Sequence, residues 1–339
     1  GFILASAHGI LAFYELVCKG IKVLPGSNLI VGRPEIWKII IYYSFLFLSV
    51  YIWAEYGDKI KTFFSMAALC LVLGFFRPAF EFLYIQMDIG QGDCACLFQK
   101  EKTYLIDGGS TSEKEIGKYR ISKMLKYYGR DTIDGVFVTH GDEDHVNGIE
   151  ELAERQENEG ITIRQILVPD LQKKEEGLQK FIQAVTGKKI PAAAIHKGQQ
   201  ITSGNLQLRC LHPAAEYEWE DANDCSLAFD LSYGNLSILT TGDLGVHGEE
   251  SITVPDKQYD ILKVGHHGSK NSSSDVFLQK CRPRYGFISA GVNNRYGHPA
   301  KETLQRLENI SCKNWNTAQK GALFAEYKRG QKRFWYFKH

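Results

Sequence analysis

Two long hydrophobic runs near the start of the chain stand apart from the rest of the sequence. The first covers residues 36–54, with Lys38 as its only charge, and the second covers residues 62–76. Each run is near the length that a helix needs to cross a bilayer, and aromatic residues cluster at its ends. A pair of buried core helices is the alternative, since the second run is short. The pattern favours a helical hairpin in a membrane.

Residues 1–10 lack the basic segment with which a signal peptide begins, and they look like the end of another membrane or interfacial helix. We therefore expect residues 1–80 to be the C-terminal part of a membrane-spanning helical region within a larger multi-pass protein. Basic residues flank the expected spans unevenly, and the positive-inside rule then indicates a cytoplasmic position for the part that follows.

From residue 81 onward, short apolar stretches rich in β-branched residues alternate with amphipathic ones. The expected strands are 82–88, 95–99, 103–107, 133–139, 163–169, 206–211, 226–232, 236–240, 260–264 and 285–289. The expected helices are 122–128, 172–185, 301–309 and one that starts at Val146. Strands and helices mixed this closely predict a layered α/β core with helices outside, and residues 81–339 are long enough for one such domain.

Charge and cysteine content narrow the function only slightly. The chain holds 40 Lys and Arg against 39 Asp and Glu, so contacts with nucleic acid have to be local or come from elsewhere in the full protein. Residues 328–337 interleave bases with aromatic residues, which indicates either such a contact or, more simply, a terminal hairpin with a packed apolar face. The eight cysteines show no CxxC pair, and we interpret them as buried thiols.

The segment Thr139–His145 sets two imidazoles and two carboxylates within six residues, directly after the apolar strand at 133–138. Mixed nitrogen and oxygen donors suit Zn²⁺, Mn²⁺ or Fe²⁺ better than Ca²⁺ or Mg²⁺. An acidic turn with two incidental histidines is the alternative. It is disfavoured because five of the ten histidines fall in three short glycine-flanked motifs.

Four further motifs lie at the ends of expected strands: Asn223–Ser226, Thr241–Asp243, His266–Ser269 and Tyr296–Pro299. Each is a weak signal alone, since a single histidine after a strand is more often structural than a ligand. In this order, and after the first motif, they predict that all five converge on one sheet edge.

These motifs, with Asp88–Asp93 and Leu105–Gly109, resemble the metallo-β-lactamase superfamily. They are most similar to the C-terminal domain of ComEC-type competence proteins, which are DNA-uptake channels. The resemblance covers residues 81 to about 330. It implies an αββα sandwich with metals at one sheet edge, preceded by the last transmembrane helices of the channel.

The resemblance also implies a set of ligands. His140 and Asp142 would hold one metal, while Asp144, His145 and His266 would hold a second. Asp243 would bridge the two. Asp142 stands where many relatives carry an imidazole, which moves the expected metal from Zn²⁺ towards Mn²⁺. The usual third imidazole of the first metal has no clear equivalent, so the number of ions stays open at one or two, with three candidates for that ligand: His212, Asn223 and Asp224.

The remaining predicted roles concern the substrate and the support of the ligands. Catalysis is assigned to Asp144, His267 and His298, with His298 as proton donor to the leaving oxygen or else a cap on a Gly-Pro turn. His267, Ser269 and Lys270 would meet a substrate phosphate, and Asn223 would also contact substrate. Asp93 and Asp107 would orient ligands or loop amides.

The expected function is metal-dependent hydrolysis of DNA phosphodiester bonds, which would degrade the strand that does not enter the cell. The expected partners are DNA, the membrane, the rest of the channel and other competence proteins. The resemblance places the hydrolase domain on the outer face, against the charge pattern. The alternatives are a hydrolase of small esters and a non-catalytic domain that grips DNA.

Overall fold

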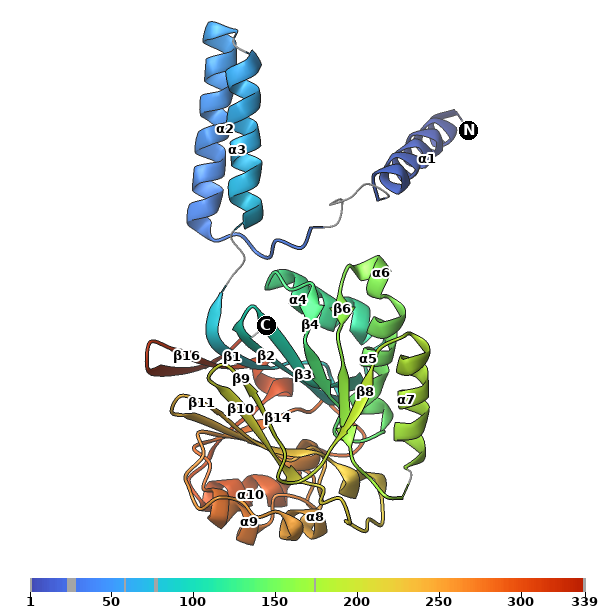
Figure 1. Ribbon diagram of the computed structural model, residues 1–339, viewed down its shortest axis with the longest axis vertical. Helices are drawn as coiled ribbons and strands as arrows, with labels where there is room; N and C mark the ends of the chain where they lie inside the picture. The colour runs from blue at the N-terminus through green and yellow to red at the C-terminus, as the bar shows by residue number, and fades with distance from the viewer. Residues whose placement is uncertain (1, 23–28, 58, 76–78, 174, 338–339) are drawn as a thin grey trace. The chain divides into compact units, whose positions relative to one another are not determined.

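The computed structural model describes residues 2–22, 29–57, 59–75, 79–173 and 175–337. Contacts divide the chain into two units, residues 1–78 with 126–131 and residues 79–125 with 132–339. The first unit contains α1 (Phe2–Lys22), α2 (Ile36–Tyr56) and α3 (Lys59–Phe75). Helices α2 and α3 run side by side in opposite directions (Figure 1), and the hydroxyls of Ser49 and Ser65 lie 2.6 Å apart between them.

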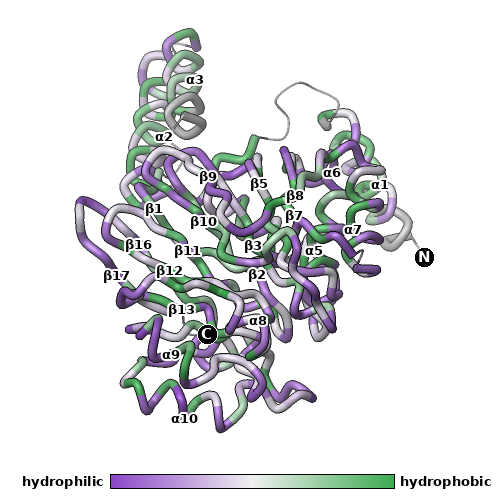
Figure 2. Tube along the Cα trace, turned by 60° about the horizontal axis from the view of Figure 1, so that its bottom comes forward, coloured by the Kyte–Doolittle hydropathy of each residue, from purple (hydrophilic) through white to green (hydrophobic). Residues whose placement is uncertain are grey.

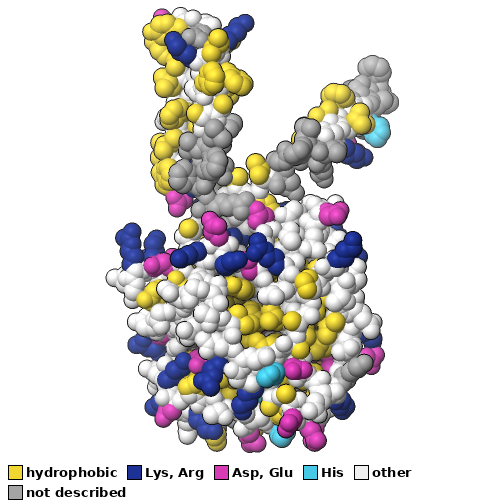
Figure 3. Space-filling view, viewed as in Figure 1, with side chains coloured by type: hydrophobic (Ala, Val, Ile, Leu, Met, Phe, Trp, Pro, Cys, Tyr) yellow, Lys and Arg dark blue, Asp and Glu magenta, His cyan; other side chains and the backbone are white. Residues whose placement is uncertain are grey.

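Helix α2 is the one helix in the described part of the chain that is long and apolar enough to cross a membrane. Only 11% of its most apolar window is buried within the protein, and Figure 3 shows hydrophobic side chains over its surface. Helix α3 has 17 residues, and residue 76, the end of the second predicted run, lies outside the described residues. Among the described residues, one helix is thus both long and apolar enough to span a membrane, where the sequence predicted two.

The second unit is built on two large mixed sheets. The strands of the first, in spatial order, are β17 (Gln331–Tyr336), β16 (Leu323–Lys328), β1 (Phe80–Gln86), β2 (Gly92–Lys100), β3 (Lys102–Ser110), β5 (Gly135–Phe137), β7 (Ile166–Pro169) and β8 (Ala192–Ile195). Those of the second are β15 (Lys313–Asn316), β14 (Tyr285–Ile288), β13 (Ile261–Lys263), β12 (Leu236–Thr240), β11 (Ala228–Tyr233), β10 (Leu206–His212) and β9 (Gln200–Ser203). A separate two-stranded parallel sheet is formed by β4 (Thr132–Ile133) and β6 (Thr162–Ile163).

Alternating apolar residues of both sheets form one core between them, and hydrophobic positions recur along the central strands (Figure 2). A second core lies between the second sheet and its helices α8 (Val246–Ser251), α9 (Asp275–Cys281) and α10 (Lys301–Asn309). The first sheet is covered by α5 (Glu143–Glu154), which packs against β3 and α7 (Glu176–Gly187). Short helices complete the unit: α4 (Ser122–Tyr127), α6 (Gln156–Glu159) and α11 (Thr317–Lys320). This arrangement confirms the predicted αββα sandwich.

Two predicted helix starts differ from the structure. Helix α7 begins at Glu176 rather than at 172, because the Glu175 carboxylate caps it by accepting hydrogen bonds from the amides of Gly177 and Leu178. Helix α5 begins at Glu143 rather than at Val146, so part of the ligand motif lies on its first turn. The terminal basic and aromatic segment forms the β16–β17 hairpin, and the seven described cysteines are free thiols.

Candidate metal centre

The motif at 139–145 turns directly from a buried strand into a helix. Strand β5 ends at Phe137, Asp142 takes the N-cap position of α5, and His145 lies on the first turn. The rings of His140 and His145 are both fully buried, with centroids 4.1 Å apart. The backbone at Gly109 on β3 lies directly against this turn, which leaves no room for a side chain at that position. The turn is therefore fixed from both sides.

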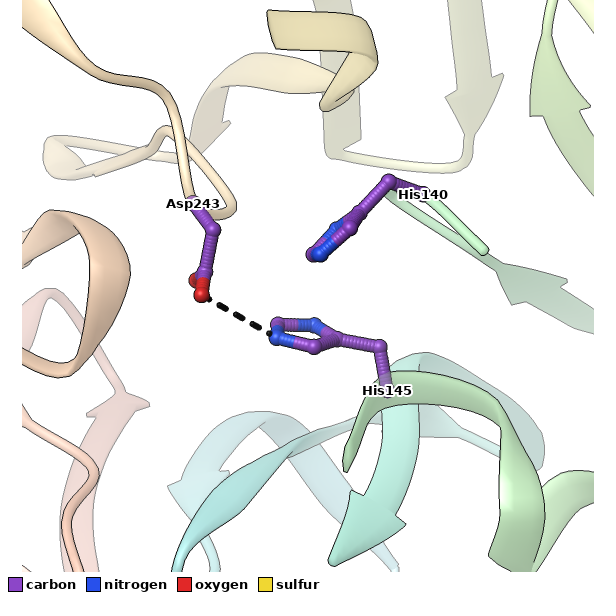
Figure 4. A group of neighbouring side chains, drawn as sticks. All are labelled: His140, His145 and Asp243. Atoms are coloured by element: carbon purple, nitrogen blue, oxygen red, sulfur yellow. Dashed lines mark ion pairs between the residues drawn. The ribbon is translucent and has the colours of Figure 1, made fainter. Parts of the chain in front are cut away.

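Asp243 and His267 reach this turn from the second sheet. Strands β12, β13 and β14 are parallel, so the segments after them emerge at one edge. Oδ2 of Asp243 lies 3.4 Å from Nε2 of His145 and 3.2 Å from Nε2 of His267. Nε2 of His267 also lies 3.3 Å from Oδ2 of Asp144. Figure 4 shows the side chains of His140, His145 and Asp243 pointing towards one another.

These five residues, His140, Asp144, His145, Asp243 and His267, are referred to below as the metal cluster. They form two overlapping groups, in each of which all donor atoms lie within 4.8 Å of one another. The first is His140, His145 and Asp243, and the second is Asp144, His145 and His267. Both groups share His145, so they are overlapping parts of one centre rather than two separate sites.

The histidines of the metal cluster fit a divalent ion. Nε2 of His140, His145 and His267 is buried without a hydrogen-bond partner among the described residues. The opposite nitrogen of each ring is anchored: Nδ1 of His145 lies 2.9 Å from Asp107 Oδ2, and Nδ1 of His267 lies 3.0 Å from the Ser289 carbonyl. This pattern leaves the Nε2 lone pairs facing inward, as metal-binding imidazoles require.

Without metal, the imidazoles and carboxylates of the metal cluster hold one another in their charged forms. Burial alone would lower the pKa of His267, but the carboxylate of Asp243 and the contact with Asp144 outweigh burial and raise it to about 9. Asp243 and Asp107 likewise raise the pKa of His145 well above its usual value, despite burial. The imidazoles in turn hold the pKa of Asp144 at about 2, although burial opposes this.

Metal binding is therefore expected to release protons. The raised pKa values favour the protonated forms of His145 and His267 in the metal-free protein, and each must lose the proton on Nε2 to become a ligand. About two protons should leave for each fully loaded centre, so apparent affinity should fall about 100-fold per pH unit below both pKa values. Calorimetric titration in two buffers of different ionisation enthalpy measures this number. Equal heats in both buffers would contradict it.

The structure brings His267, rather than the predicted ligand His266, into the metal cluster. His266 was the expected ligand, but its side chain is 29% exposed and its Nε2 lies 3.9 Å from Asp243 Oδ2. His267 is 2% exposed and belongs to the metal cluster. The cause is local, because both residues adopt the left-handed conformation, with φ of 48° and 54°, in the tight turn Gly265–Gly268. This backbone directs the second imidazole inward.

The first predicted metal position is less complete. The Asp142 side chain is 46% exposed, 3.6 Å from His140 Nε2, and belongs to neither group. None of the three candidates for the missing ligand joins the metal cluster. His212 is buried, with Nδ1 2.9 Å from the Ser226 carbonyl, and burial lowers its pKa to about 4. Asp224 is buried and Asn223 half-buried in the loop before β11.

The other predicted residues surround the metal cluster. Asp107 accepts hydrogen bonds from the Thr139 amide and hydroxyl, at 2.7 and 2.8 Å, in addition to its contact with His145. It therefore links β3 to the ligand turn. His298 is half-buried with its ring 6.4 Å from that of His267. Ser269 is buried, and Lys270 is exposed.

Lys263 is the residue that sequence reasoning missed. It is 3% exposed at the end of β13, where its ammonium contacts the Asp93 carboxylate, the Gly242 carbonyl at 3.0 Å and Asp243 Oδ1 at 3.4 Å. Burial opposes its charge, but Asp93 and Asp243 raise the pKa of Lys263. Its position inside the otherwise apolar strand 261–264 is the sequence feature that could have identified it. It neutralises Asp93 and leaves only one Asp243 oxygen facing the imidazoles.

Comparison with known proteins agrees with this geometry. The family model described as Metallo-beta-lactamase superfamily matches residues 87–292. The chain is 31% identical over 258 residues to ComE operon protein 3 of Bacillus subtilis, covering 71% of the chain and 32% of that protein. It is 26% identical over 270 residues to Recombination protein 2 of Haemophilus influenzae, covering 78% and 31%. The chain thus spans about a third of the length of these curated relatives, and they confirm the resemblance to competence proteins.

Among solved structures, the metallo-beta-lactamase fold protein YhfI from Bacillus subtilis superposes with a TM-score of 0.46 at 12% identity, covering 69% of this chain and 95% of that one. The family match extends from the end of β1 past β14, and so includes every residue of the metal cluster. The chain belongs to the metallo-beta-lactamase superfamily.

Proposed function

We propose that this chain is a metal-dependent phosphodiester hydrolase that cuts DNA as part of a membrane DNA-uptake system. The observation that carries the proposal is the metal cluster, in which three buried and unpaired Nε2 atoms face two carboxylates. Membership of the superfamily supports a metal-dependent hydrolase, and the similarity to ComE operon protein 3 and Recombination protein 2 supports DNA as the substrate. Helix α2 supports attachment to a membrane.

The metal cluster would hold one or two Mn²⁺ or Zn²⁺ ions, with Asp243 shared between them. Imidazole and carboxylate donors suit both metals. When bound, such an ion makes hydroxide available near neutral pH and neutralises charge that develops on a phosphate. Asp107 and the Ser289 carbonyl fix the ring orientations of His145 and His267, so these ligands need little rearrangement to bind.

The residues around the metal cluster would bind and orient the substrate. Lys270 is exposed, so its ammonium is free to contact a phosphate, and Ser269 and Asn223 would add hydrogen bonds. Burial, together with His266 and His267, lowers the pKa of His298 to about 4, which leaves its imidazole neutral at pH 7. His298 would therefore have to take up a proton before it could protonate a leaving oxygen. We place the domain on the outer face of the membrane, where the incoming strands separate.

A metal add-back assay tests the function. The full chain, purified in detergent and stripped of metal, is incubated with linear duplex and single-stranded DNA, with and without Mn²⁺ or Zn²⁺. We expect cleavage only when metal is present. Lactones, phosphocholine esters and cyclic nucleotides are assayed in parallel. Hydrolysis of one of these without DNA cleavage would indicate a small-molecule hydrolase, and DNA binding without cleavage under either metal would indicate a non-catalytic DNA-gripping domain.

A further inference from the structure

The loop 291–298, between β14 and α10, brings a row of rings up to the metal cluster. The ring of His298 lies parallel to that of His267, with centroids 6.4 Å apart and an angle of 24° between the planes. The ring of Tyr296 lies in turn parallel to that of His298, at 5.7 Å and 22°. Three aromatic rings therefore lead from a candidate metal ligand to the protein surface.

An exposed arginine lies next to Tyr296 and is bonded to its hydroxyl. The guanidinium carbon of Arg295 lies 4.8 Å from the Tyr296 ring centroid, and its Nη2 donates a hydrogen bond of 2.6 Å to the Tyr296 hydroxyl. The hydrogen bond to Tyr296 is the main reason that the pKa of Arg295 is raised. Arg295 and Tyr296 therefore hold one another in place.

The loop is held in this shape by one side chain. The Asn294 amide donates hydrogen bonds to the carbonyls of Gly291 and His298, at 2.9 and 2.6 Å. Its oxygen accepts from the amides of Tyr296 and His298, at 3.2 and 3.0 Å. The loop is also tied to the histidine turn, because the Ala300 amide donates to the Gly268 carbonyl at 2.9 Å. Tyr296 is therefore presented on an ordered support.

The exposure of these side chains is the feature that the hydrolytic chemistry does not explain. Tyr296 is 49% exposed and the neighbouring Val292 is 70% exposed, although both are large hydrophobic residues. An exposed, oriented aromatic ring offers a stacking surface to any nucleobase, and an adjacent guanidinium offers a partner to a phosphate. In a duplex, base faces are covered by their neighbours, so only an unpaired nucleotide can use both groups.

We propose that Tyr296 and Arg295 form a nucleotide platform that stacks an unpaired base and contacts a backbone phosphate beside the metal cluster. The inference rests on the proposed function, because the platform would determine that the DNA accepted by the hydrolytic site is single-stranded. The platform selects single-stranded over double-stranded nucleic acid. It also places the phosphate next to the bound base close to the metal cluster.

The test measures binding of the full chain in chelator, by fluorescence anisotropy, to a single-stranded oligonucleotide and to an abasic strand of equal length. Stacking of one base should make the base-containing strand bind about 5- to 150-fold more tightly. Tyr296→Ala is expected to abolish this preference, and Tyr296→Phe to keep it. Arg295→Gln should weaken both strands alike and reduce the slope of log affinity against log salt by about 0.7.

Tyr119→Ala is the matched control. Tyr119 is 52% exposed with the Lys118 ammonium 4.3 Å from its ring centroid, an arrangement similar to that of Tyr296, but it lies in the short helix Gly117–Ile121 and not in the loop 291–298. This variant should bind both strands as the wild type does. Equal affinity of the wild type for the two strands, failure to bind either strand, or a preference that survives Tyr296→Ala would each overturn the platform.

Hydrolysis is measured separately with metal, so that the two proposals can fail independently. DNA cleavage that is equally fast in the wild type and in Tyr296→Ala would overturn the platform and leave the nuclease standing. Base-dependent binding through Tyr296 with no metal-dependent cleavage of DNA would overturn the nuclease and leave the platform standing.

Discussion

Asp243→Asn is expected to abolish metal binding and DNA hydrolysis while leaving the fold in place. Asparagine has nearly the same shape, but it removes the negative charge that faces His145 and His267 through one oxygen and Lys263 through the other. An ion at such a site supplies several kcal/mol of transition-state stabilisation, so hydrolysis should fall about 1,000-fold or more. Metal content is measured by mass spectrometry and cleavage by gel.

Asp230→Asn is the control for this substitution. Asp230 is a largely buried carboxylate on β11 of the same sheet, paired with Lys257 at 2.8 Å and outside the metal cluster. It should keep both metal and activity. Circular dichroism establishes that both variants are folded. A folded Asp243→Asn protein that retains full metal content would show that Asp243 is not a ligand.

Gly109→Ala is expected to cause a large loss of stability. A methyl group there would lie 2.5 Å from the backbone carbonyl oxygen of Glu143 and from the backbone carbonyl carbon of Asp144. Backbone atoms cannot rotate away as a flexible side chain does, so the first turn of α5 must move. We expect a cost of about 3 kcal/mol or more and a melting temperature about 5–10 °C lower, with weaker metal binding.

Gly187→Ala provides the comparison. Gly187 ends α7, and an added methyl group there would meet nothing within 4 Å. That variant should unfold at the wild-type temperature or slightly above it, because alanine restricts the unfolded chain. The measurement is the melting temperature of both variants and of the wild type, each with and without metal. If Gly109→Ala melts as the wild type does, the close approach of β3 to the ligand turn is not rigid.

Much of the sandwich was predictable because its strands are short, apolar and bounded by turns. Strands β10, β11, β12, β13 and β14 all fall within a few residues of their predicted ranges. The histidine and aspartate motifs follow buried strands, so a parallel arrangement would bring them to one edge. The terminal hairpin was also predictable from its alternation of side chains. Helix starts were less accurate, because capping of α7 by the Glu175 carboxylate depends on side-chain geometry.

The sequence by itself determined the fold class, the chemistry of the donors and the strand ends at which they lie, because these follow from local periodicity and residue type. Only the tertiary structure decided which atoms meet. The left-handed turn at 265–268 places His267 rather than His266 against Asp243, and the packing of the two sheets sets Lys263 between Asp93 and Asp243. Side-chain direction depends on backbone angles and on partners distant in the sequence, such as Asp93 for Lys263, and a local sequence pattern specifies neither.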